Sequence, residues 1–580
     1  MMSTRVLPTL ALLVATLIVT IAAAPPPETA PADAAGRRVD DYLTRLVPHG
    51  LSGAVLIARG GKVVLKKGYG LANRATGLAY SAAMASCIGS VTKQFTGAAI
   101  VKLEMEGRLT TSDPIAKYLP GVAPDKTGIT IHQLLTHTAG FSGDLGGGDE
   151  EPIERDALVA RVLAAPLAFR PGERFEYSNE GYSLAGAIVE RVSGQGYEQY
   201  LRERLWLPAG MRDTGYLLPQ WPLTSLPLGY GEDGREWGRV FNRGWLADGP
   251  GWYLRANGGI HATLDDLYRW HVALGGSSLL SADALGKYQT GHVNSPGGHE
   301  RYAYGWGVEK TRRDTTVIAH NGGNGFFFTD FRRYVDEGVV IIAMTNEPVI
   351  RATELAARQL ESLVFADGPM PVVPPLAVEI PGDTRAALAG LYRLDDGSEL
   401  TVRASATGLD VETSNPMILS NVMTSGGRFA ELESRTLAIV DRATQDDFRP
   451  LFEAFDDDRP FEVIQRNQRR FWGEWRERFG AFDRAELLGT GPVDGDPAVT
   501  VRLRFKSGGP VLQFIWGPRR LAGWRALPPA VPVALLAESP ATWVYYSYRL
   551  PYLITVTFED GGSLRLTRGS TEMRGRRTER

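Results

Sequence analysis

The chain has 580 residues and a mass of 63.2 kDa, which is too long for one hydrophobic core and enough for several domains of about 150 residues each. Hydrophobic residues make up 43% and charged residues 22%, which excludes collagen, a coiled coil and wholesale disorder. The net charge of -3 gives no overall attraction to nucleic acid, and the single cysteine, Cys87, excludes an intramolecular disulfide framework and a site built from several thiolates. We therefore expect a multi-domain enzyme that uses hydroxyl, carboxylate, amine or imidazole groups and no cofactor.

Residues 1–24 have the pattern of a secretory signal peptide. Arg5 precedes an apolar run from Val6 to Ile21, which is followed by Ala22-Ala23-Ala24 and three prolines. The run is short for a stable membrane-spanning helix, which needs about 20 residues. An uncleaved anchor is the alternative, because Pro25 is unfavourable directly after a cleavage site. We expect a periplasmic or secreted protein without stable membrane insertion after cleavage, and a disordered leader over residues 25–36.

Residues 37–365 contain both helical and strand patterns. Arg37 to Val47 has helical periodicity, and Gly53 to Ala58 and Lys62 to Tyr69 are predicted as a hairpin around Gly60-Gly61. Further helices are predicted over Ser90–Glu106, Asp125–Thr138, Leu184–Val192 and Leu264–Leu274. Strands are predicted over Trp306–Glu309, Thr315–Ala319, Gly325–Tyr334 and Gly338–Thr345. Because strands lie at both ends with helices between them, we expect one α/β domain of the α+β type, with a sheet assembled from the two ends.

A proline-rich linker is predicted over residues 366–384, followed by two small domains. The first, over 385–446, is expected to be β-rich, with strands at Leu391–Tyr392, Glu399–Arg403, Gly408–Glu412 and Thr436–Val440. The second, over 447–580, is expected to be an α+β accessory domain, with a helix at Phe448–Phe479 interrupted at Pro460 and strands at Val499–Phe505, Val511–Trp516, Trp543–Tyr548 and Ile554–Phe558. The basic segment from Arg568 to Arg580 is predicted to be a solvated tail. Core positions are expected for Trp472, Trp475, Trp516, Trp524 and Trp543.

Serine is the candidate nucleophile. The chain has no G-x-S-x-G and no H-E-x-x-H, and its eight histidines show no metal-ligand spacing, so no metal site is expected. Lys93 is the one lysine with a serine, Ser90, three residues before it. At a helix N-terminus this spacing places the amine on the same face as the hydroxyl, beside unpaired backbone N–H groups. That arrangement can activate a serine, although a serine before a helical lysine is also ordinary N-cap chemistry.

Two more short motifs follow in order, Tyr177-Ser178-Asn179 and His320-Asn321-Gly322. Together with Ser90-x-x-Lys93 they resemble the motifs of the penicillin-recognising serine hydrolases, in the branch of class C β-lactamases, D-aminopeptidases and esterases. Supporting stretches over residues 37–365 are Ile88–Phe95, Leu134–Gly140, Phe175–Tyr182, Gly258–Ile260 and Tyr304–Gly307. The resemblance implies a β-lactamase/transpeptidase-like fold, an antiparallel sheet flanked by helices with an all-helical subregion. The C-terminal part resembles the β-rich accessory domains of some members.

The resemblance also implies catalytic roles for three residues. Ser90 would attack a carbonyl to give an acyl-enzyme, Lys93 would order and polarise Ser90, and Tyr177 would take and return the proton. A tyrosine or lysine with an ordinary pKa near 10 is a poor base at pH 7, so Lys93 and Tyr177 must lie close enough to perturb each other.

Four residues are expected to bind the substrate: Asn179, His320, Gly322 and Gly323. Asn179 would hydrogen-bond to the substrate or Lys93, and His320 would hold Tyr177 or the substrate. The oxyanion would lie between the backbone N–H groups of Ser90 and Gly323. Because the antibiotic-hydrolysing members carry lysine where this chain has His320, a largely neutral group at pH 7, we expect ester, amide or amino-terminal peptide substrates.

Other conspicuous residues are expected to be structural. Lys126-Thr127-Gly128 spells the lysine form of the third motif but precedes Tyr177, so it is interpreted as a coincidence. Structural roles are also expected for His132 and His137 as hydrogen-bonded residues, for Cys87 as a packed residue and for Phe326-Phe327-Phe328 as strand core; Gly146-Gly147-Gly148 is expected to be a flexible loop.

Three alternatives stay open. The pocket could bind penicillin without turnover, as in a sensor, the protein could be a true β-lactamase, or the C-terminal part could dock a partner or polysaccharide. Substrate choice is expected to depend on the loops Asp144–Asp149 and Leu217–Asn242. A small molecule or peptide is the expected partner, with no nucleic acid, and the sequence leaves the oligomeric state undetermined.

Overall fold

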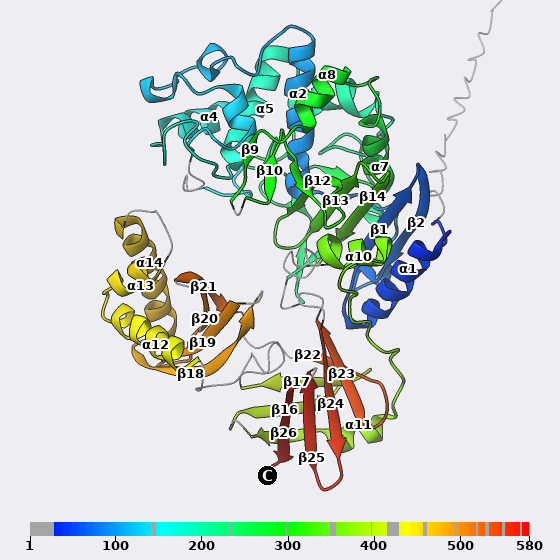
Figure 1. Ribbon diagram of the computed structural model, residues 1–580, viewed down its shortest axis with the longest axis vertical. Helices are drawn as coiled ribbons and strands as arrows, with labels where there is room; N and C mark the ends of the chain where they lie inside the picture. The colour runs from blue at the N-terminus through cyan, green and yellow to red at the C-terminus, as the bar shows by residue number, and fades with distance from the viewer. Residues whose placement is uncertain are drawn as a thin grey trace, which may run out of the picture.

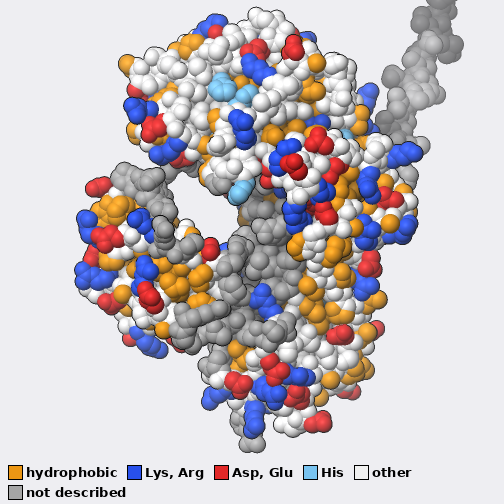
Figure 2. Space-filling model, viewed as in Figure 1, with side chains coloured by type: hydrophobic (Ala, Val, Ile, Leu, Met, Phe, Trp, Pro, Cys, Tyr) orange, Lys and Arg blue, Asp and Glu red, His pale blue; other side chains and the backbone are white. Residues whose placement is uncertain are grey.

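The computed structural model describes residues 28–141, 147–231, 234–296, 298–347, 355–395, 397–414, 429–455, 461–493, 496–517, 520–527, 533–547, 552–568 and 571–578 (Figure 1). The predicted signal peptide therefore lies outside the described residues. Within the described ranges, no helix is both long enough and apolar enough to cross a membrane. On the face seen in Figure 2, acidic and basic side chains are interspersed, in keeping with the small net charge.

The first domain is built on an eight-stranded antiparallel sheet with the order β2-β1-β14-β13-β12-β11-β10-β9. The strands are β1 (Gly53–Arg59), β2 (Lys62–Tyr69), β9 (Val293–Asn294), β10 (Glu300–Tyr302), β11 (Gly307–Lys310), β12 (Thr316–Gly323), β13 (Phe328–Tyr334) and β14 (Val339–Thr345). The N-terminal hairpin joins the sheet through β1 and β14, where Gly53 lies opposite Thr345. This confirms the predicted sheet assembled from both ends of the domain.

Helices cover both faces of this sheet (Figure 1). α1 (Ala34–Leu46) and α10 (Glu361–Phe365) lie on one face, and α2 (Thr92–Met105), α5 (Asn179–Ser193), α7 (Leu264–Ala273) and α8 (Ala282–Gln289) belong to the other side. Successive strand residues alternate between the two cores, so that Leu56 packs with the second group and Ile57 with the first. α2 is buried nearly all round, as expected of a helix enclosed in a core.

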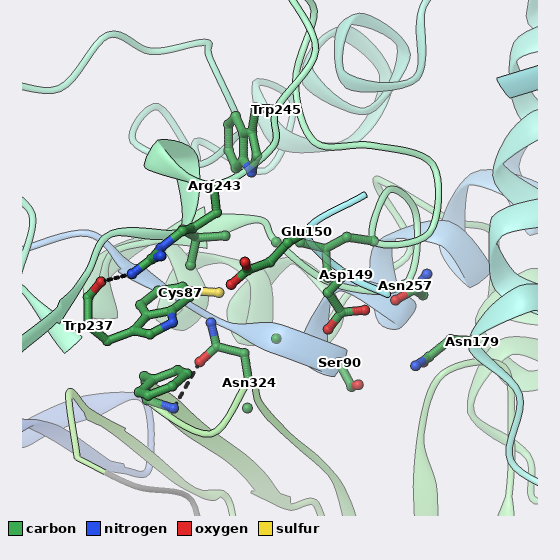
Figure 3. Close-up of a pocket in the computed structure, with 17 residues that line it drawn as sticks. Cys87, Ser90, Asp149, Glu150, Asn179, Trp237, Arg243, Trp245, Asn257 and Asn324 are labelled. Carbon is green, nitrogen blue, oxygen red and sulfur yellow. Dashed lines mark hydrogen bonds between the residues drawn. The ribbon is translucent and has the colours of Figure 1, made fainter. Parts of the chain in front are cut away.

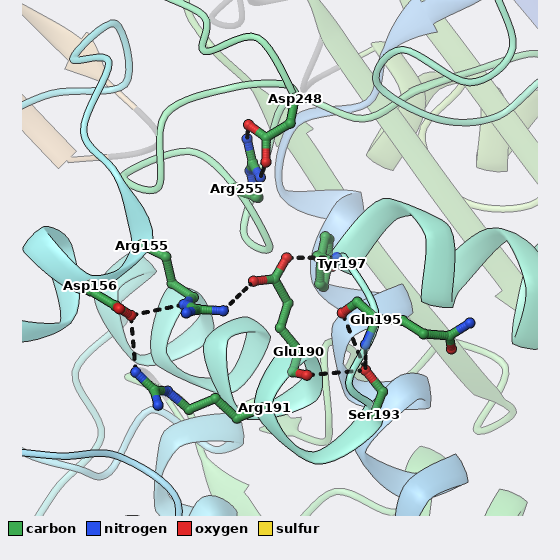
Figure 4. A network of polar contacts seen from close by, with 9 residues as sticks. All are labelled: Arg155, Asp156, Glu190, Arg191, Ser193, Gln195, Tyr197, Asp248 and Arg255. Atoms are coloured by element: carbon green, nitrogen blue, oxygen red, sulfur yellow. Dashed lines mark hydrogen bonds and ion pairs between the residues drawn. The ribbon is translucent and has the colours of Figure 1, made fainter.

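A helical subregion completes the domain with α3 (Ile131–Leu135), α4 (Arg155–Ala164) and α6 (Tyr197–Leu201). Figure 4 shows the polar contacts that connect it: Arg155 forms a 2.9 Å ion pair with Glu190 of α5, and the same carboxylate accepts a 2.7 Å hydrogen bond from the Tyr197 N–H group. The Tyr197 hydroxyl in turn lies 2.5 Å from Oγ1 of Thr96 in α2. These contacts fix α4, α5 and α6 against the central helix. Short strand pairs lie at the edges: β3 (Leu71–Asn73) with β4 (Leu78–Ala79), β5 (Ser86–Cys87) with β8 (His261–Ala262), and β6 (Gly229–Tyr230) with β7 (Glu236–Gly238).

Residues 28–36, predicted to belong to a disordered leader, instead lie along the edge strand β2. Thr29 pairs with Lys66, and the Ala32 N–H group donates to the Val64 carbonyl at 2.9 Å. Asp33 then caps α1 by accepting a 2.7 Å hydrogen bond from the Gly36 N–H group. The segment satisfies backbone groups that the edge of the sheet would otherwise leave unpaired, which gives it a structure that composition alone did not indicate.

The C-terminal part is one closed barrel with an inserted unit, so the predicted boundary at residues 446 and 447 is wrong. After α11 (Gly382–Leu388), the barrel consists of β15 (Gly390–Leu394), β16 (Glu399–Ala404), β17 (Leu409–Thr413), β22 (Val533–Ala537), β23 (Thr542–Ser547), β24 (Tyr552–Glu559), β25 (Ser563–Arg568) and β26 (Thr571–Arg577). The predicted solvated tail is also wrong, because β26 pairs with both β25 and β15. Closing the barrel leaves no free sheet edge, and it buries Met573.

The inserted unit occupies residues 430–527 between β17 and β22 (yellow to orange in Figure 1). Its helices α12 (Ala430–Thr444), α13 (Arg449–Ala454) and α14 (Phe461–Phe479) accompany a sheet of β18 (Phe482–Val493), β19 (Asp496–Phe505), β20 (Val511–Trp516) and β21 (Leu521–Leu527). The strand predicted over Thr436–Val440 lies in α12, where Thr436, Val440 and Ala443 are buried at helical spacing. Trp472, Trp516 and Trp543 are core residues as predicted, and Trp475 and Trp524 pack partly buried against the core of this unit.

The barrel contacts the first domain through Tyr546 of β23. This side chain belongs to the same core cluster as Val39 and Leu43 of α1, and its hydroxyl lies 2.6 Å from the Tyr42 hydroxyl. The ring of His49 lies 5.7 Å from the Tyr546 ring. The barrel is therefore packed on the first domain, and Tyr546 of β23, with Leu553 of β24, completes that core.

We predict that the inserted unit can be removed without unfolding the rest. β17 and β22 pair directly, with Val411 opposite Val533, so replacing residues 415–532 by a short Asn-Gly linker should restore a simple hairpin. Thermal unfolding followed by circular dichroism should then show a cooperative transition near that of the full chain. Truncation after residue 532 is the control and should lose that transition, since it removes Tyr546. Equal unfolding of both variants would contradict this domain organisation.

Candidate active site

Ser90 lies where a strand, a tight turn and the central helix meet. β5 leads through Ile88 into a single 3-10 turn, Gly89–Val91, and α2 begins at Thr92. Gly89 has a φ of 50°, in the left-handed region that favours glycine. The end of β12 packs directly on this turn: a Cβ atom on Gly322 would lie 2.3 Å from the backbone nitrogen of Ser90. The third predicted motif therefore meets the first through backbone contact, which places Gly322 and Gly323 beside Ser90 as expected.

The Lys93 amine is the centre of the site. It is fully buried, and its Nζ lies 3.0 Å from Ser90 Oγ, 2.7 Å from Asn179 Oδ1 and 2.9 Å from the Asn257 carbonyl oxygen. Burial lowers the pKa of Lys93 to about 7, against the opposing effect of the Asp149 and Glu180 carboxylates. As a neutral amine, Lys93 can donate its two hydrogens to Asn179 and Asn257 and accept the Ser90 proton.

Asn179 is held by the start of α5. The preceding Ser178 is the N-cap, whose hydroxyl oxygen accepts a 3.1 Å hydrogen bond from the Gly181 N–H group. The Ser178 N–H group donates to Nδ1 of His137 at 3.0 Å. These two hydrogen bonds of Ser178 fix the start of α5, which positions the Asn179 amide beside Lys93.

Tyr177 lies at the rim of the site. Its ring centroid is 4.8 Å from Lys93 Nζ and 4.3 Å from the ring of His137. The Tyr177 side chain is 41% exposed; desolvation by the surrounding protein raises the pKa of Tyr177, and an interaction with the Ser90 side chain opposes this rise. Tyr177 is therefore a neutral phenol, suited to donating a proton rather than to accepting one.

His320 lies beside Tyr177 as a neutral ring that makes its hydrogen bonds to other residues. Its Nε2 lies 2.9 Å from the Tyr302 hydroxyl and its Nδ1 lies 2.5 Å from the Asn321 carbonyl oxygen, while its ring is 6.4 Å from the Tyr177 ring. Since a carbonyl accepts, Nδ1 carries the hydrogen and Nε2 accepts from Tyr302. Burial and then the nearby Lys93 lower the pKa of His320 to about 3, so the ring is neutral. His320 was expected to hold Tyr177 or the substrate; its ring is near the Tyr177 ring, and its side-chain hydrogen bonds are to Tyr302 and Asn321.

A pocket opens beside Ser90 (Figure 3). Its lining includes Asn179 and Asn257 near Lys93, the backbone of Gly323, and the side chains Cys87, Asp149, Glu150, Trp237, Val240, Arg243, Trp245, Leu254, Asn324 and Phe326. Trp237 and Val240 come from the loop that we expected to select the substrate. Cys87 is packed as predicted, with 2% exposure, and it also lines the pocket. Of the three phenylalanines, Phe327 and Phe328 are core and Phe326 faces the pocket.

The structure thus brings together Ser90, Lys93 and Asn179 by hydrogen bonds, with Tyr177 alongside. Sequence reasoning missed Asn257 and Tyr302, and it missed that His137, although buried and hydrogen-bonded as predicted, supports Tyr177. Lys126 of the coincidental motif lies in a 3-10 turn, Pro124–Lys126, and pairs with Asp125. Part of the predicted glycine loop, up to Gly146, lies outside the described residues.

A serine activated by a buried lysine at the end of an antiparallel sheet is the arrangement of a class of serine hydrolases. The Beta-lactamase family matches residues 39–364. The chain belongs to this family.

Relatives agree with that assignment. Over 272 residues the chain is 30% identical to the Bacillus subtilis (strain 168) protein PbpX, which carries the name of a penicillin-binding protein; the match covers 47% of this chain and 65% of that protein. Over 409 residues it is 26% identical to Penicillin-binding protein 4* of the same organism, covering 66% and 88%. The fold also resembles the octameric penicillin-binding protein homologue from Pyrococcus abyssi, with a TM-score of 0.53, 19% identity and coverage of 93% and 99%.

We predict that Gly322→Ala disables the site. The added Cβ would lie 2.3 Å from both the Ile88 carbonyl oxygen and the Ser90 nitrogen, so β12 or the serine turn must shift. A displacement of this size lowers reactivity about 100-fold, which the labelling rate with a fluorophosphonate would report. Gly128→Ala is the matched control, since nothing lies within 4 Å of its Cβ. Labelling of Gly322→Ala at the rate of Gly128→Ala would show that β12 does not position Ser90.

Proposed function

We propose that the chain is an exported serine hydrolase that cleaves an ester, amide or peptide bond through an acyl-enzyme on Ser90. The observation that carries this proposal is the Lys93 amine, 3.0 Å from Ser90 Oγ and surrounded by neutral hydrogen-bond acceptors. A small ester or a D-amino-acid-containing peptide is the substrate class that membership of the family supports. The penicillin-binding names of its relatives are consistent with a pocket of this kind.

In acylation, neutral Lys93 accepts the Ser90 proton while Oγ attacks the substrate carbonyl carbon. Asn179 and the Asn257 carbonyl accept the two hydrogens of the neutral amine, so its lone pair is directed at Ser90. The oxyanion is stabilised by the backbone N–H groups of Ser90 and Gly323, which both border the pocket. The positive charge that forms on Lys93 is favoured by Asp149 and Glu180.

In the second half of acylation, Tyr177 donates its proton to the departing alcohol or amine. The sequence suggested that Tyr177 takes the proton first, but the raised pKa of Tyr177 and the lowered pKa of Lys93 favour the opposite assignment. Lys93, whose Nζ lies 4.8 Å from the centroid of the Tyr177 ring, then gives Tyr177 the proton that it took from Ser90. Water releases the acyl group in a reversed sequence of steps. His137 and Tyr302 act as positioning residues for Tyr177, since both pack on its ring.

The neutral state of His320 argues against substrates recognised by a carboxylate. A β-lactam or a peptide C-terminus needs a cation at this position, and His320 is occupied by Tyr302 and Asn321. This leaves esters, amides and amino-terminal peptides as the favoured class and makes a true β-lactamase the second candidate.

Export to the periplasm or outside the cell is part of the proposal and rests on the sequence of residues 1–24. Mass spectrometry of the mature N-terminus would identify cleavage near Ala24, and an intact Met1 on membrane-bound protein would favour the anchor.

Replacing Ser90 tests the nucleophile. Ser90→Ala should lose fluorophosphonate labelling and lower ester turnover by a factor of about 1,000 or more, whereas the exposed Ser112→Ala should behave as wild type. Equal labelling of both variants would exclude Ser90. Stable labelling of the wild type with no turnover of neutral esters, D-amino-acid amides or penicillin would favour the non-turnover sensor.

The pH dependence tests the base. Because the reactive form of Lys93 is the neutral amine and its pKa is lowered to about 7, kcat/KM for a neutral ester should rise as the pH increases through about 7. Lys93→Arg replaces the neutral amine by a permanently charged guanidinium, so it should lower kcat/KM by a factor of about 1,000 and abolish this rise. Lys310→Arg, at an exposed lysine, is the control. An unchanged profile in Lys93→Arg would mean that another group titrates.

A further inference from the structure

Two carboxylates face the pocket next to the nucleophile. Asp149 and Glu150 both line the pocket that contains Ser90. Figure 3 shows the Asp149 carboxylate extending toward Ser90 and the Glu150 carboxylate extending toward Cys87. Asp149 also lies close enough to Lys93 to act on its protonation. The two acids therefore lie at the position that the substrate would occupy around its reacting carbonyl.

Neither carboxylate has a hydrogen-bond or ion-pair partner among the residues that the structure describes. The next residue, Glu151, shows the contrast, because it forms a two-pronged ion pair with Arg161 at 2.8 and 2.9 Å. The arginine that lines the pocket, Arg243, is turned away from the acids: it donates to the Trp237 carbonyl and stacks over the Trp237 ring at 4.7 Å. Two carboxyl groups are thus left for a ligand.

The same pocket has an apolar side. Trp237 and Phe326 stack on each other, with centroids 4.5 Å apart and an interplanar angle of 11°, and they form a flat wall. Cys87, Leu254 and Trp245 continue this apolar surface in the same cluster. A hydrocarbon or aromatic group of a substrate can pack here while its polar part lies at Ser90.

We propose that Asp149 and Glu150 bind an ammonium group of the substrate beside its reacting carbonyl, and that the Trp237–Phe326 wall binds an apolar side chain on the same acyl unit. The substrate class is then an α-amino acyl amide, ester or peptide with a free amino terminus. This inference rests on the proposed function of Ser90. It goes beyond that function because it assigns substrate specificity to Asp149 and Glu150, which belong to none of the three sequence motifs.

The state of the basic groups around the pocket is consistent with this assignment. Within the described part of the pocket, His320 is neutral and Lys93 is hydrogen-bonded to Ser90, Asn179 and Asn257. The one fixed cation of the described lining, Arg243, is engaged with the carbonyl and the ring of Trp237. An ammonium group gains from two nearby carboxylates, whereas an N-acetyl group in the same place would leave them unpaired and partly desolvated.

A matched substrate series tests the proposal. Both enantiomers of phenylalanine p-nitroanilide carry the ammonium group, N-acetylphenylalanine p-nitroanilide masks it, and 3-phenylpropanoyl p-nitroanilide lacks it. We expect wild-type kcat/KM to be about 10-fold or more higher for one free-amine enantiomer than for the masked or deaminated compound. In Asp149→Asn/Glu150→Gln this ratio should fall to near 1. Glu154→Gln, an exposed acid on the same segment that does not line the pocket, should keep the wild-type ratio.

A binding measurement separates recognition from chemistry. Phenethylamine has the ammonium and the ring but no carbonyl, and it should competitively inhibit turnover of p-nitrophenyl butyrate by the wild type and by Glu154→Gln. The double variant should lose most of this inhibition.

The outcomes are distinct. A wild-type ratio near 1, or an unchanged ratio in the double variant, overturns ammonium recognition, and Ser90-dependent turnover of the neutral ester then shows that the serine hydrolase function stands. Loss of all Ser90-dependent labelling and turnover overturns the proposed function and this inference together.

Discussion

The amine of Lys93 lies in the protein interior and has no ion-pair partner among the residues that the structure describes, and the rest of the site depends on this. Two other buried lysines show the ordinary solution: Lys66 pairs with Asp265 at 3.1 Å and Lys126 pairs with Asp125 at 2.9 Å. An ammonium taken out of water without such a partner costs several kcal/mol, so the group favours its neutral form. Around Lys93 the hydrogen-bond partners are a hydroxyl, an amide and a peptide carbonyl, all of which suit a neutral amine. Because no carboxylate of the described residues is hydrogen-bonded to the Lys93 amine, its pKa stays low enough for the lysine to act as a base near neutral pH.

This arrangement needs rigid neighbours, because the acceptors come from three separate parts of the chain. Asn257 follows Ala256, whose φ of 72° is unfavourable for a residue with a Cβ atom and costs about 1 kcal/mol or more. Thr96 holds that strained turn by donating to the Ala256 carbonyl at 2.6 Å, and Tyr197 holds Thr96. The polar contacts between α4, α5 and α6 thus reach the site through one side chain of α2, which connects the packing of the helical subregion to the orientation of the base.

The sequence predicts those residues of the site that lie within a few positions of one another in a short motif. Ser90 and Lys93 are three residues apart on one helix, and Asn179 follows a tyrosine and an N-cap serine, so their chemistry is visible in short motifs. Asn257 acts through a backbone carbonyl, which leaves no side-chain signature, and Tyr302 is placed by the pairing of distant strands. The same distinction separates the two halves of the fold. The first domain was predicted from its long, strongly patterned elements, whereas the barrel pairs β17 with β22 across an insertion of more than a hundred residues. Composition and periodicity do not indicate which distant strands pair. The domain boundary predicted from them in the C-terminal part was therefore wrong.

Electrostatics also connects recognition to the base. Asp149 raises the pKa of Lys93, against the larger lowering effect of burial. A cation bound to Asp149 cancels this contribution and adds its own repulsion, and a substrate that excludes water deepens the desolvation of the amine. Both changes lower the pKa of Lys93, so binding increases the fraction of neutral amine at a given pH. Once Lys93 has accepted the Ser90 proton, the opposite holds, and Asp149 and Glu180 stabilise the charge that chemistry has created. Carboxylates placed near the lysine but not hydrogen-bonded to it can therefore support the protonated intermediate without fixing the resting enzyme in its protonated state.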